Sequence, residues 1–300
     1  MKCSRKIEFS SPSLSYRKAG VQVTALERNP QLEPRVEWLV GGHLFYSTDA
    51  AKCFTDLKFS VARTSMYEIS GSSEPLKLSS VEHLAPVFLM WPTRRFVVNV
   101  DRNEDGGAEI PQMDGSALPF FLALRKEVGV PEELSFYDAP VHDAWDLFRT
   151  DVKDSAQAQT PYGSVRISPS EAFEVEYVLE RNTDSGVFKS AASVSIYSPE
   201  DLYNVFAART FIFKKEFDEA RKAGLLGGVD ESCGLLLEDL PKSNALAYRV
   251  LEEPARHKIL DLLGDLCFAK PALPRVRIEI TNGGHISHHQ IMEKIISYAL

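Results

Sequence analysis

Short segments in which apolar and polar residues alternate recur in both halves of this 300-residue chain. Alternation with a period of two is typical of strands that bury one face, so each segment predicts a strand against a core. Signals for helices fall between these segments, so both halves are expected to mix strands and helices. The predicted strands are Val21–Leu26, Val36–Val40, Phe96–Val100, Phe173–Leu179, Ser193–Tyr197 and Arg275–Ile280.

Capping residues and apolar spacing predict where several helices begin and end. One helix is expected to begin near Ser80, and a second to run from about Ser116 to Gly129. A third begins at Ser198, where serine is the cap and a proline takes the first helical position. Residues 131–160 are polar, and we expect them to hold the connection between two domains.

Composition excludes several classes of function. The formal charge of -8 argues against nucleic acid or an anionic membrane surface as a partner, since either would need a basic face. No stretch reaches the roughly 18 apolar residues that span a bilayer, and the basic N-terminus is not followed by the apolar core of a signal peptide. The four cysteines lack any Cys-x-x-Cys spacing, which predicts reduced thiols in a cytosolic protein.

The neighbours Glu82 and His83 can supply a general base and a metal ligand from one helical turn. A structural interpretation competes with this one, because Ser79-x-x-Glu82 also fits a capping box, in which the glutamate only closes the start of a helix. The residues alone leave both interpretations open.

A second polar group lies on the predicted helix Arg256–Leu266. His257, Asp261 and Asp265 are spaced i, i+4 and i+8, so they form one stripe along the helix, and neighbours four apart can share a metal ion. Leucine and isoleucine fill the opposite arc, so this stripe could also be the solvated face of an amphipathic helix.

A third group follows the last predicted strand. Gly283 and Gly284 permit a tight turn that could aim His285 into a cleft. Three of the seven histidines fall in this stretch. We interpret His288 and His289 as ordinary surface histidines at the start of the C-terminal helix.

Taken jointly, these segments resemble the UDP-3-O-acyl-N-acetylglucosamine deacetylase family of lipid A synthesis. The similar motifs are TVEHL at Val81–Leu84, PIMDGSA-PF at Glu109–Phe120, ARTF at Ala208–Phe211, GLA-GG at Gly224–Gly228, RHKILDxxGDL at Arg256–Leu266 and GGH at Gly283–His285. They stand in family order, and neither a GxSxG, P-loop, GxGxxG nor HExxH motif competes with them.

The resemblance implies an α+β fold of two similar domains, each a β-sheet packed with α-helices, with the active site between them. The N-terminal domain would span residues 1–130 and the C-terminal domain residues 131–300. It further implies an insert at about residues 181–206 that forms a passage for an acyl chain. The residues expected to line this passage are Val187, Phe188, Val194 and Ile196.

The resemblance also implies a zinc site made by His83, His257 and Asp261, with iron(II) as the alternative metal. Two imidazoles and one carboxylate leave a position open on zinc, as hydrolysis requires. Glu82 would then be the general base that takes a proton from water.

The remaining family roles fall on residues around this metal site. His285 would stabilise the oxyanion or protonate the leaving amine, and Asp265 would orient His285. Thr210 would donate to the oxyanion. Lys258 would meet the phosphates or sugar of the substrate, and Phe211 its apolar part.

The activity implied is zinc-dependent removal of the N-acetyl group from UDP-3-O-acyl-N-acetylglucosamine, giving UDP-3-O-acyl-glucosamine and acetate in the cytoplasm. We expect a monomer whose partner is this small acylated UDP-sugar. Two alternatives are a family paralogue with a shifted amide substrate and a catalytically silent binder of acylated sugar nucleotides.

The chain departs from the family pattern in three places. The N-terminal GLHSG signature is absent, and the nearest stretch is Ser13–Tyr16. Asn282 replaces the lysine that usually precedes GGH, and His288 replaces the asparagine usual three residues after its histidine. These departures concern contacts to substrate more than the metal site.

Overall fold

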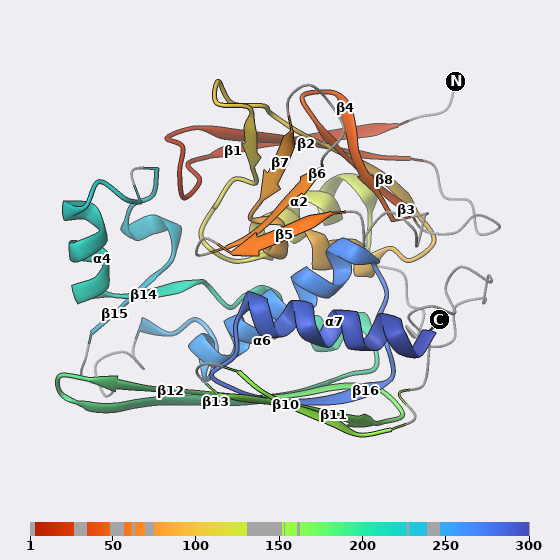
Figure 1. Cartoon of the computed structure of the whole chain (residues 1–300). Coiled ribbons are helices and arrows are strands. Elements are labelled where there is room, and N and C mark those ends of the chain that lie inside the picture. The colour runs from red at the N-terminus through yellow and green to blue at the C-terminus, as the bar shows by residue number, and fades with distance from the viewer. Residues whose placement is uncertain are drawn as a thin grey trace.

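The computed structural model describes residues 4–26, 35–48, 57–61, 64–69, 75–130, 152, 154–160, 163–226, 228–238 and 247–299. Two five-stranded sheets form the outer layers, and helices fill the space between them (Figure 1). The fold is therefore α+β, as expected, with one five-stranded sheet in each half of the chain. The predicted connection between the halves falls largely on residues 131–151, which lie outside the described residues.

The first sheet has the strand order β1-β2-β8-β3-β4. β3 and β8 pair parallel, and the other neighbours pair antiparallel. Its strands are β1 (Arg5–Ser11), β2 (Ala19–Ala25), β3 (Arg35–Val40), β4 (His43–Ser47) and β8 (Arg95–Val100).

The second sheet repeats this arrangement, with the order β10-β11-β16-β12-β13. β12 and β16 pair parallel, and the other neighbours again pair antiparallel. Its strands are β10 (Ala156–Gln159), β11 (Ser164–Pro169), β12 (Phe173–Thr183), β13 (Gly186–Ile196) and β16 (Val276–Thr281). The strands predicted from alternation all lie in these two sheets.

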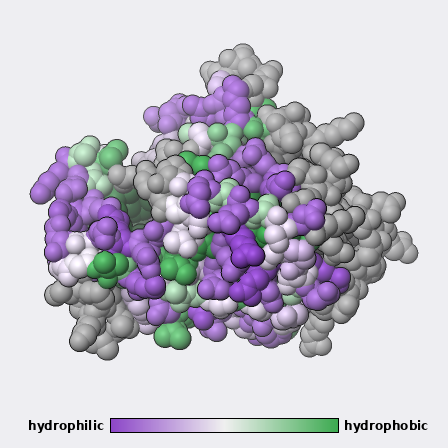
Figure 2. Space-filling view, turned by 60° about the horizontal axis from the view of Figure 1, so that its bottom comes forward, coloured by the Kyte–Doolittle hydropathy of each residue, from purple (hydrophilic) through white to green (hydrophobic). Residues whose placement is uncertain are grey.

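Burial explains why the alternation was informative. Along β3 and β8 every second residue is buried, including Trp38 and Val98, and these residues face the helical layer. β13 alternates in the same way, with Lys189 and Ser193 pointing outward. Figure 2, which brings the second sheet forward, shows a mostly hydrophilic outer face with separate hydrophobic spots.

Two smaller sheets complete the strands. A four-stranded sheet with the order β5-β6-β7-β9 belongs to the first half, and β14 and β15 form a parallel pair in the second. Their bounds are β5 (Lys58–Val61), β6 (Ser65–Ile69), β7 (Leu76–Ser79), β9 (Gly107–Glu109), β14 (Phe211–Phe213) and β15 (Leu235–Leu237).

Of the three helices predicted from capping residues, two are confirmed and one is corrected. α2 (Leu118–Val128) ends at Gly129, and the helical segment after Ser198 begins with the capping box of that serine and Asp201. The helix expected from Ser80 is instead two 3-10 helices, η1 (Val81–His83) and η2 (Ala85–Met90). Pro86 lacks the N–H that an α-helix would need there, so the backbone cannot continue as one α-helix. The other helices are η3 (Pro199–Leu202), α3 (Tyr203–Phe206), α4 (Lys214–Lys222), η4 (Glu231–Cys233), α6 (Glu253–Ala269) and α7 (His285–Ala299).

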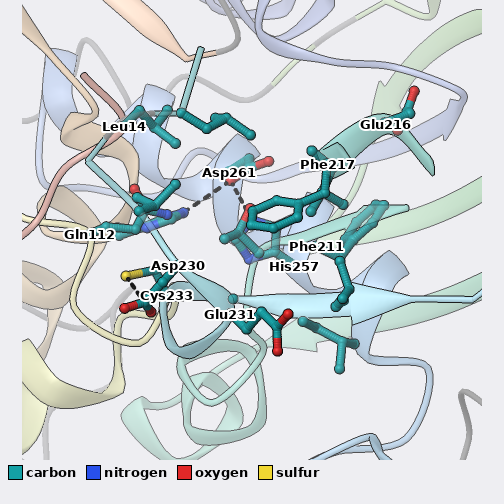
Figure 3. A pocket seen from close by; sticks show the side chains of 18 of the residues that line it. Leu14, Gln112, Phe211, Glu216, Phe217, Asp230, Glu231, Cys233, His257 and Asp261 are labelled. Carbon is teal, nitrogen blue, oxygen red and sulfur yellow. Dashed lines mark hydrogen bonds and ion pairs between the residues drawn. The ribbon is translucent and has the colours of Figure 1, made fainter. Parts of the chain in front are cut away.

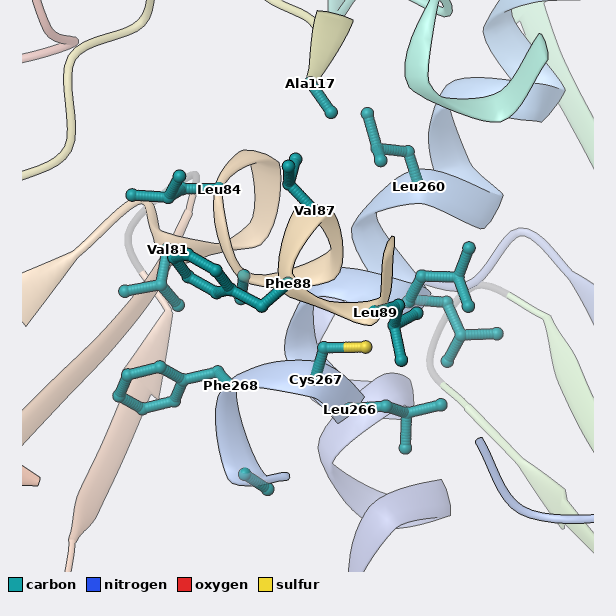
Figure 4. Packing of buried hydrophobic residues seen from close by; sticks show 14 of the residues in the cluster. Val81, Leu84, Val87, Phe88, Leu89, Ala117, Leu260, Leu266, Cys267 and Phe268 are labelled. Atoms are coloured by element: carbon teal, nitrogen blue, oxygen red, sulfur yellow. The ribbon is translucent and has the colours of Figure 1, made fainter. Parts of the chain in front are cut away.

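α6 is the centre of the molecule. It packs against η1 and η2 from the first half and against α7, β12 and β13 from the second. Leu260, Leu266 and Phe268 meet Val87 and Phe88 in one continuous core (Figure 4). Every residue of α6 is buried except Arg256 and Lys258, so its polar stripe is not a solvated face.

Gly264 allows the two halves to approach each other closely. A Cβ atom at this position would lie 2.0 Å from the carbonyl oxygen of Glu82, so any larger residue would collide with the backbone of η1. Glycine is therefore required for η1 to rest directly on α6.

The structure bears on two expectations from composition, which concern membrane-spanning segments and cysteines. None of the helices of the described residues is both long enough and apolar enough to cross a membrane. Cys233 and Cys267 are buried free thiols, and the other two cysteines lie outside the described residues.

Candidate functional site

A cavity of about 410 Å³ opens where the two halves meet (Figure 3). Its polar end is lined by side chains from η1, α6 and the start of α7, and its apolar end by residues of the segment 211–236. The predicted site residues that line it are Glu82, His83, Thr210, Phe211, His257, Lys258, Asp261 and His285. The fold therefore gathers on one cavity all the predicted site residues except Asp265, which lies behind His285.

His83, His257 and Asp261 meet at the polar end. The Nε2 atoms of His83 and His257 lie 3.6 and 3.2 Å from Oδ1 of Asp261, and all three side chains are buried. Their donor atoms lie within 4.8 Å of one another, so one ion could contact all three. η1 brings the first histidine from the N-terminal half, and successive turns of α6 bring the other two residues.

The hydrogen bonding of His257 indicates that a cation belongs between these side chains. Its Nδ1 atom lies 3.1 Å from the carbonyl oxygen of Ala208, which can only accept, so Nδ1 carries the proton. Burial lowers the pKa of His257, so the ring is neutral and its Nε2 lone pair faces the carboxylate of Asp261. Two electron-rich atoms at this distance repel unless a cation lies between them, so the donor set fits a divalent metal.

Asp261 is ionised despite its burial. Burial alone would raise the pKa of Asp261, but the imidazole of His257 and the ammonium of Lys258 beside it hold the pKa well below its ordinary value. Lys258 donates from Nζ to Oδ2 at 2.8 Å, and the same ammonium lies 5.5 Å from the centre of the Phe211 ring. Lys258 therefore faces both the carboxylate and the apolar wall.

Glu82 is a buried carboxylate directed toward the cavity, and it does not cap a helix. Ser79, the cap residue of that interpretation, donates its hydroxyl to the carbonyl oxygen of Ala108, and Ser80, at the observed cap position of η1, makes no side-chain capping bond. Oε1 of Glu82 accepts from the hydroxyl of Thr64 and lies 3.8 Å from Nε2 of His285, whereas Oε2 has no protein partner among the described residues. Burial raises the pKa of Glu82, against the opposing fields of His285 and His83. The capping interpretation is therefore wrong.

His285 and Asp265 form a buried pair. Nδ1 of His285 lies 2.7 Å from Oδ2 of Asp265, while Oδ1 of the same carboxylate accepts from the hydroxyl of Ser65. Burial alone would lower the pKa of His285, but the charge and hydrogen bond of Asp265 outweigh it and raise the pKa to about 9. Burial would raise the pKa of Asp265, but His285 and His288 lower it to about 2.

His288 was interpreted as a surface histidine, and that interpretation is wrong. Its side chain is completely buried, and Nδ1 lies 2.8 Å from Oδ2 of Asp265. The spacing of three residues from His285 was the available signal, since residues three apart share one face of a helix. His289 also differs, because its ring is mostly buried and stacks on Phe59 with centroids 4.1 Å apart.

Thr210 is placed by a partly buried ion pair beside it. Arg209 contacts the carboxylate of Glu253, at the start of α6, through its backbone N–H and its guanidinium. The backbone N–H of Thr210 donates to the carbonyl of Gly115 at 2.6 Å. The ARTF-like segment is therefore fixed to both halves of the molecule at once.

The apolar wall comes from a later segment than predicted. Phe211, Phe217, Leu226 and Leu236 line it, and β14, α4 and β15 supply most of these positions. The residues expected from 181–206 lie elsewhere: Val194 and Ile196 are in the main core, Phe188 packs behind Phe213, and Val187 is 60% exposed. The long hairpin of β12 and β13 therefore supports the wall from behind without lining the cavity.

Two departures from the family pattern acquire a structural explanation. The Ser13–Tyr16 stretch brings Leu14 to the cavity, and the buried carboxylate of Glu109 holds it by accepting from the Ser13 hydroxyl and the Ser15 backbone. Asn282 does not line the cavity, because its side-chain oxygen accepts from the backbone of Glu180. Both contacts join segments far apart in the sequence.

Comparison with known proteins agrees with this geometry. A family model described as UDP-3-O-acyl N-acetylglycosamine deacetylase matches residues 29–297. The UDP-3-O-acyl-N-acetylglucosamine deacetylase of Helicobacter hepaticus is 27% identical over 259 residues, covering 85% of this chain and 79% of the relative. That of Hamiltonella defensa is 24% identical over 288 residues, covering 95% and 82%, and that of Campylobacter hominis is 29% identical over 227 residues, covering 75% and 70%. The chain belongs to the UDP-3-O-acyl N-acetylglycosamine deacetylase family.

Proposed function

We propose that this chain hydrolyses the N-acetyl group of UDP-3-O-acyl-N-acetylglucosamine, using a divalent metal held by His83, His257 and Asp261, and releases UDP-3-O-acyl-glucosamine and acetate. The observation that carries the proposal is the convergence of these three side chains with Glu82 and His285 on one cavity with an apolar end. Names of relatives that cover most of the chain support the same substrate.

When bound, a zinc or iron(II) ion would lower the pKa of water and polarise the acetamide carbonyl. Side chains of the protein would accept and donate the protons that this hydrolysis requires. Glu82 has one oxygen without a protein partner and a raised pKa, both of which suit a base that takes a proton from water. His285, 3.8 Å away, holds a proton on Nε2 to give to the oxyanion or the leaving amine.

The apolar end of the cavity fits the acyl chain. Phe211 and Phe217 lie beside His257 and Asp261 (Figure 3), so an amide at the metal would be within reach of an acyl chain on the same sugar. Thr210 is proposed to donate to the oxyanion, and Lys258 to contact the phosphates or sugar. The boundary between the two domains is proposed to lie between residues 130 and 131. The protein is proposed to act as a monomer in the cytoplasm.

The direct test is deacetylation of UDP-3-O-acyl-N-acetylglucosamine by the purified protein, with metal content measured on the same sample. We expect one zinc or iron per chain, release of acetate, and loss and recovery of activity when a chelator removes the metal and zinc is returned. A protein that holds the metal but cleaves only other N-acyl sugars would have a shifted substrate. A metal-free protein that binds the UDP-sugar unchanged would be a silent binder.

A further inference from the structure

His288 lies behind the cavity, out of reach of a molecule bound there. Its side chain is completely buried, and it is not among the residues that line the cavity, whereas His285 is. The two histidines are three positions apart on α7, so both imidazoles point to the same side of the helix. Both Nδ1 atoms reach one oxygen, Oδ2 of Asp265, at 2.7 and 2.8 Å.

The charge of Asp265 fixes where the protons lie. An ionised carboxylate only accepts hydrogen bonds, so Nδ1 of His285 and Nδ1 of His288 both carry a proton. Burial lowers the pKa of His288 and keeps that ring neutral, and its Nε2 atom has no partner among the described residues. Among the described residues, the side chain of His288 therefore makes its hydrogen bond to Asp265.

Three donors surround this carboxylate. Ser65, in β6, donates to Oδ1, and its hydroxyl oxygen lies 3.0 Å from Nδ1 of His285. His285 and His288 share Oδ2. A carboxylate that accepts an additional hydrogen bond is a weaker partner for the imidazolium beside it, because part of its charge is already stabilised. His288 thus both orients Asp265 and moderates its hold on the proton of His285.

We propose that His288 is a positioning residue for the deacetylation reaction, an inference that rests on the proposed function: it fixes the Asp265 carboxylate against His285 and limits how tightly that carboxylate holds the proton. The groups that face His285 are Asp265 and Asp261 from α6, Glu82 from η1, and His288 from its own helix. His288 is the neutral member, so replacing it changes hydrogen bonding without changing formal charge.

The experiment compares H288N, H288Q and H288L in the zinc-loaded enzyme. The amide nitrogen of asparagine can take the place of Nδ1, whereas that of glutamine lies one carbon farther and leucine has no donor. Turnover is followed against pH, and the pKa of His285 is followed by NMR of protein with ¹⁵N-labelled histidine. Zinc content and melting temperature are measured in parallel.

In H288L and H288Q we expect the pKa of His285 and the basic limb of turnover to move up by about one pH unit, the scale of one hydrogen bond to a charged group. Turnover at the optimum should fall about tenfold, as for other residues that support a site through a second residue. H288N should resemble the unchanged protein in both measurements.

An unmoved His285 pKa in H288L and H288Q would overturn the inference, even if turnover fell. Equal effects of all three substitutions would also overturn it, because His288 would then only fill space. If H288L does not fold, the contrast between H288N and H288Q decides alone. An unchanged, zinc-loaded protein inactive on the UDP-sugar would refute the proposed function, while the NMR titration would still test the contact between His288 and Asp265.

Discussion

The two halves of the molecule share a sheet topology but differ in the segment that each places at the cavity. In the first half, the connection that leads back to the parallel central strand β8 carries η1 and η2. In the second half, the corresponding connection to β16 carries the 17-residue helix α6. The proposed metal ligands come from both connections, one from η1 and two from α6. The site therefore exists only where these two unequal connections pack together.

The position of a proline in each connection explains much of the difference between the two halves. Pro254 lies at the start of α6, where a missing N–H costs nothing, so the helix continues without interruption. Pro86 follows η1 closely and limits the first half to short 3-10 turns. A long helix can place His257, Asp261 and Asp265 in register. The short turn instead needs Thr64 and Gly264 to hold Glu82 in place.

If both halves supply metal ligands, removing a ligand from either half should have the same effect on metal content and activity. This effect should be the largest of those predicted here. H83A and D261A should each lose the bound metal and reduce deacetylation to background, because two ligands hold zinc far less tightly than three. Metal analysis after dialysis, beside the activity assay, measures both. His43→Ala, an exposed histidine of β4, is the control. If H83A kept a full complement of metal, the first half would not be a ligand donor.

The next prediction distinguishes the role of Glu82 from that of its neighbour His83 on η1. Glu82→Gln should keep the metal but lower turnover by about a hundred- to ten-thousandfold, the usual contribution of a general base. Single-turnover rates and metal content on the same sample test this. Glu8→Gln, on an exposed position of β1, serves as control. Loss of the metal in Glu82→Gln would instead make Glu82 a ligand.

Gly264→Ala tests the contact between the halves directly. The added methyl group would collide with the backbone of η1, so we expect destabilisation of about 1–3 kcal/mol and displacement of Glu82. A displacement of about 1 Å can lower turnover about a hundredfold. Gly284→Ala, where a Cβ meets nothing within 4 Å, is the matched control for the melting temperature. A variant with unchanged melting temperature and turnover would show that the halves need not approach so closely.

Asp265→Asn tests the buried pair within the second half. Asp265 raises the pKa of His285, so its loss lowers that pKa. Because His285 must be protonated to act, the rate falls as pH rises through this pKa, and the basic limb should move to lower pH with roughly tenfold slower turnover. H285A combined with D265N should be little worse than H285A alone. Fully additive losses would show that the two residues do not work together.

The last prediction concerns the apolar wall of the cavity, where the effect depends on the length of the acyl chain. Phe217→Ala should weaken kcat/KM for a long acyl chain by about tenfold, as expected for losing part of a buried apolar contact, and change a short-chain substrate less. Val187→Ala, in the hairpin first expected to line the passage, should change neither. If Val187→Ala changed the dependence on acyl-chain length and Phe217→Ala did not, the acyl passage would be formed by residues 181–206.

The strands were predictable because alternation reports local burial, whereas the spacing along α6 predicted a helix but not that its polar stripe is buried. Alternation along β3 or β16 directly reflects which face of a sheet meets the core. The apolar spacing after Ser80 predicts one helix and does not show the division into η1 and η2, which depends on Pro86. The resemblance supplied most site residues correctly as neighbours, although their roles remain proposals.

Residues that support the site from a distance in sequence could not be predicted. Ser65 contacts Asp265 across 200 positions, and neither residue carries a pattern that points to the other. The same holds for Glu109 and the Ser13–Tyr16 stretch. Such contacts depend on how the halves pack, which a local pattern does not record. His288 was different, since its helical spacing from His285 was visible in the sequence.

His285 is the first residue of α7, and this position gives the imidazole a second electrostatic influence. The aligned peptide dipoles of a helix place partial positive charge at its N-terminus, where a cation is disfavoured. The field of the helix therefore opposes the carboxylate of Asp265. When His285 gives up its proton, the field of the helix favours the neutral ring. His285 is therefore a stronger acid than its ion pair with Asp265 alone would make it. Without Asp265, burial and the helix would both lower the pKa of this histidine, and only the fields of Glu82 and Asp261 would oppose them.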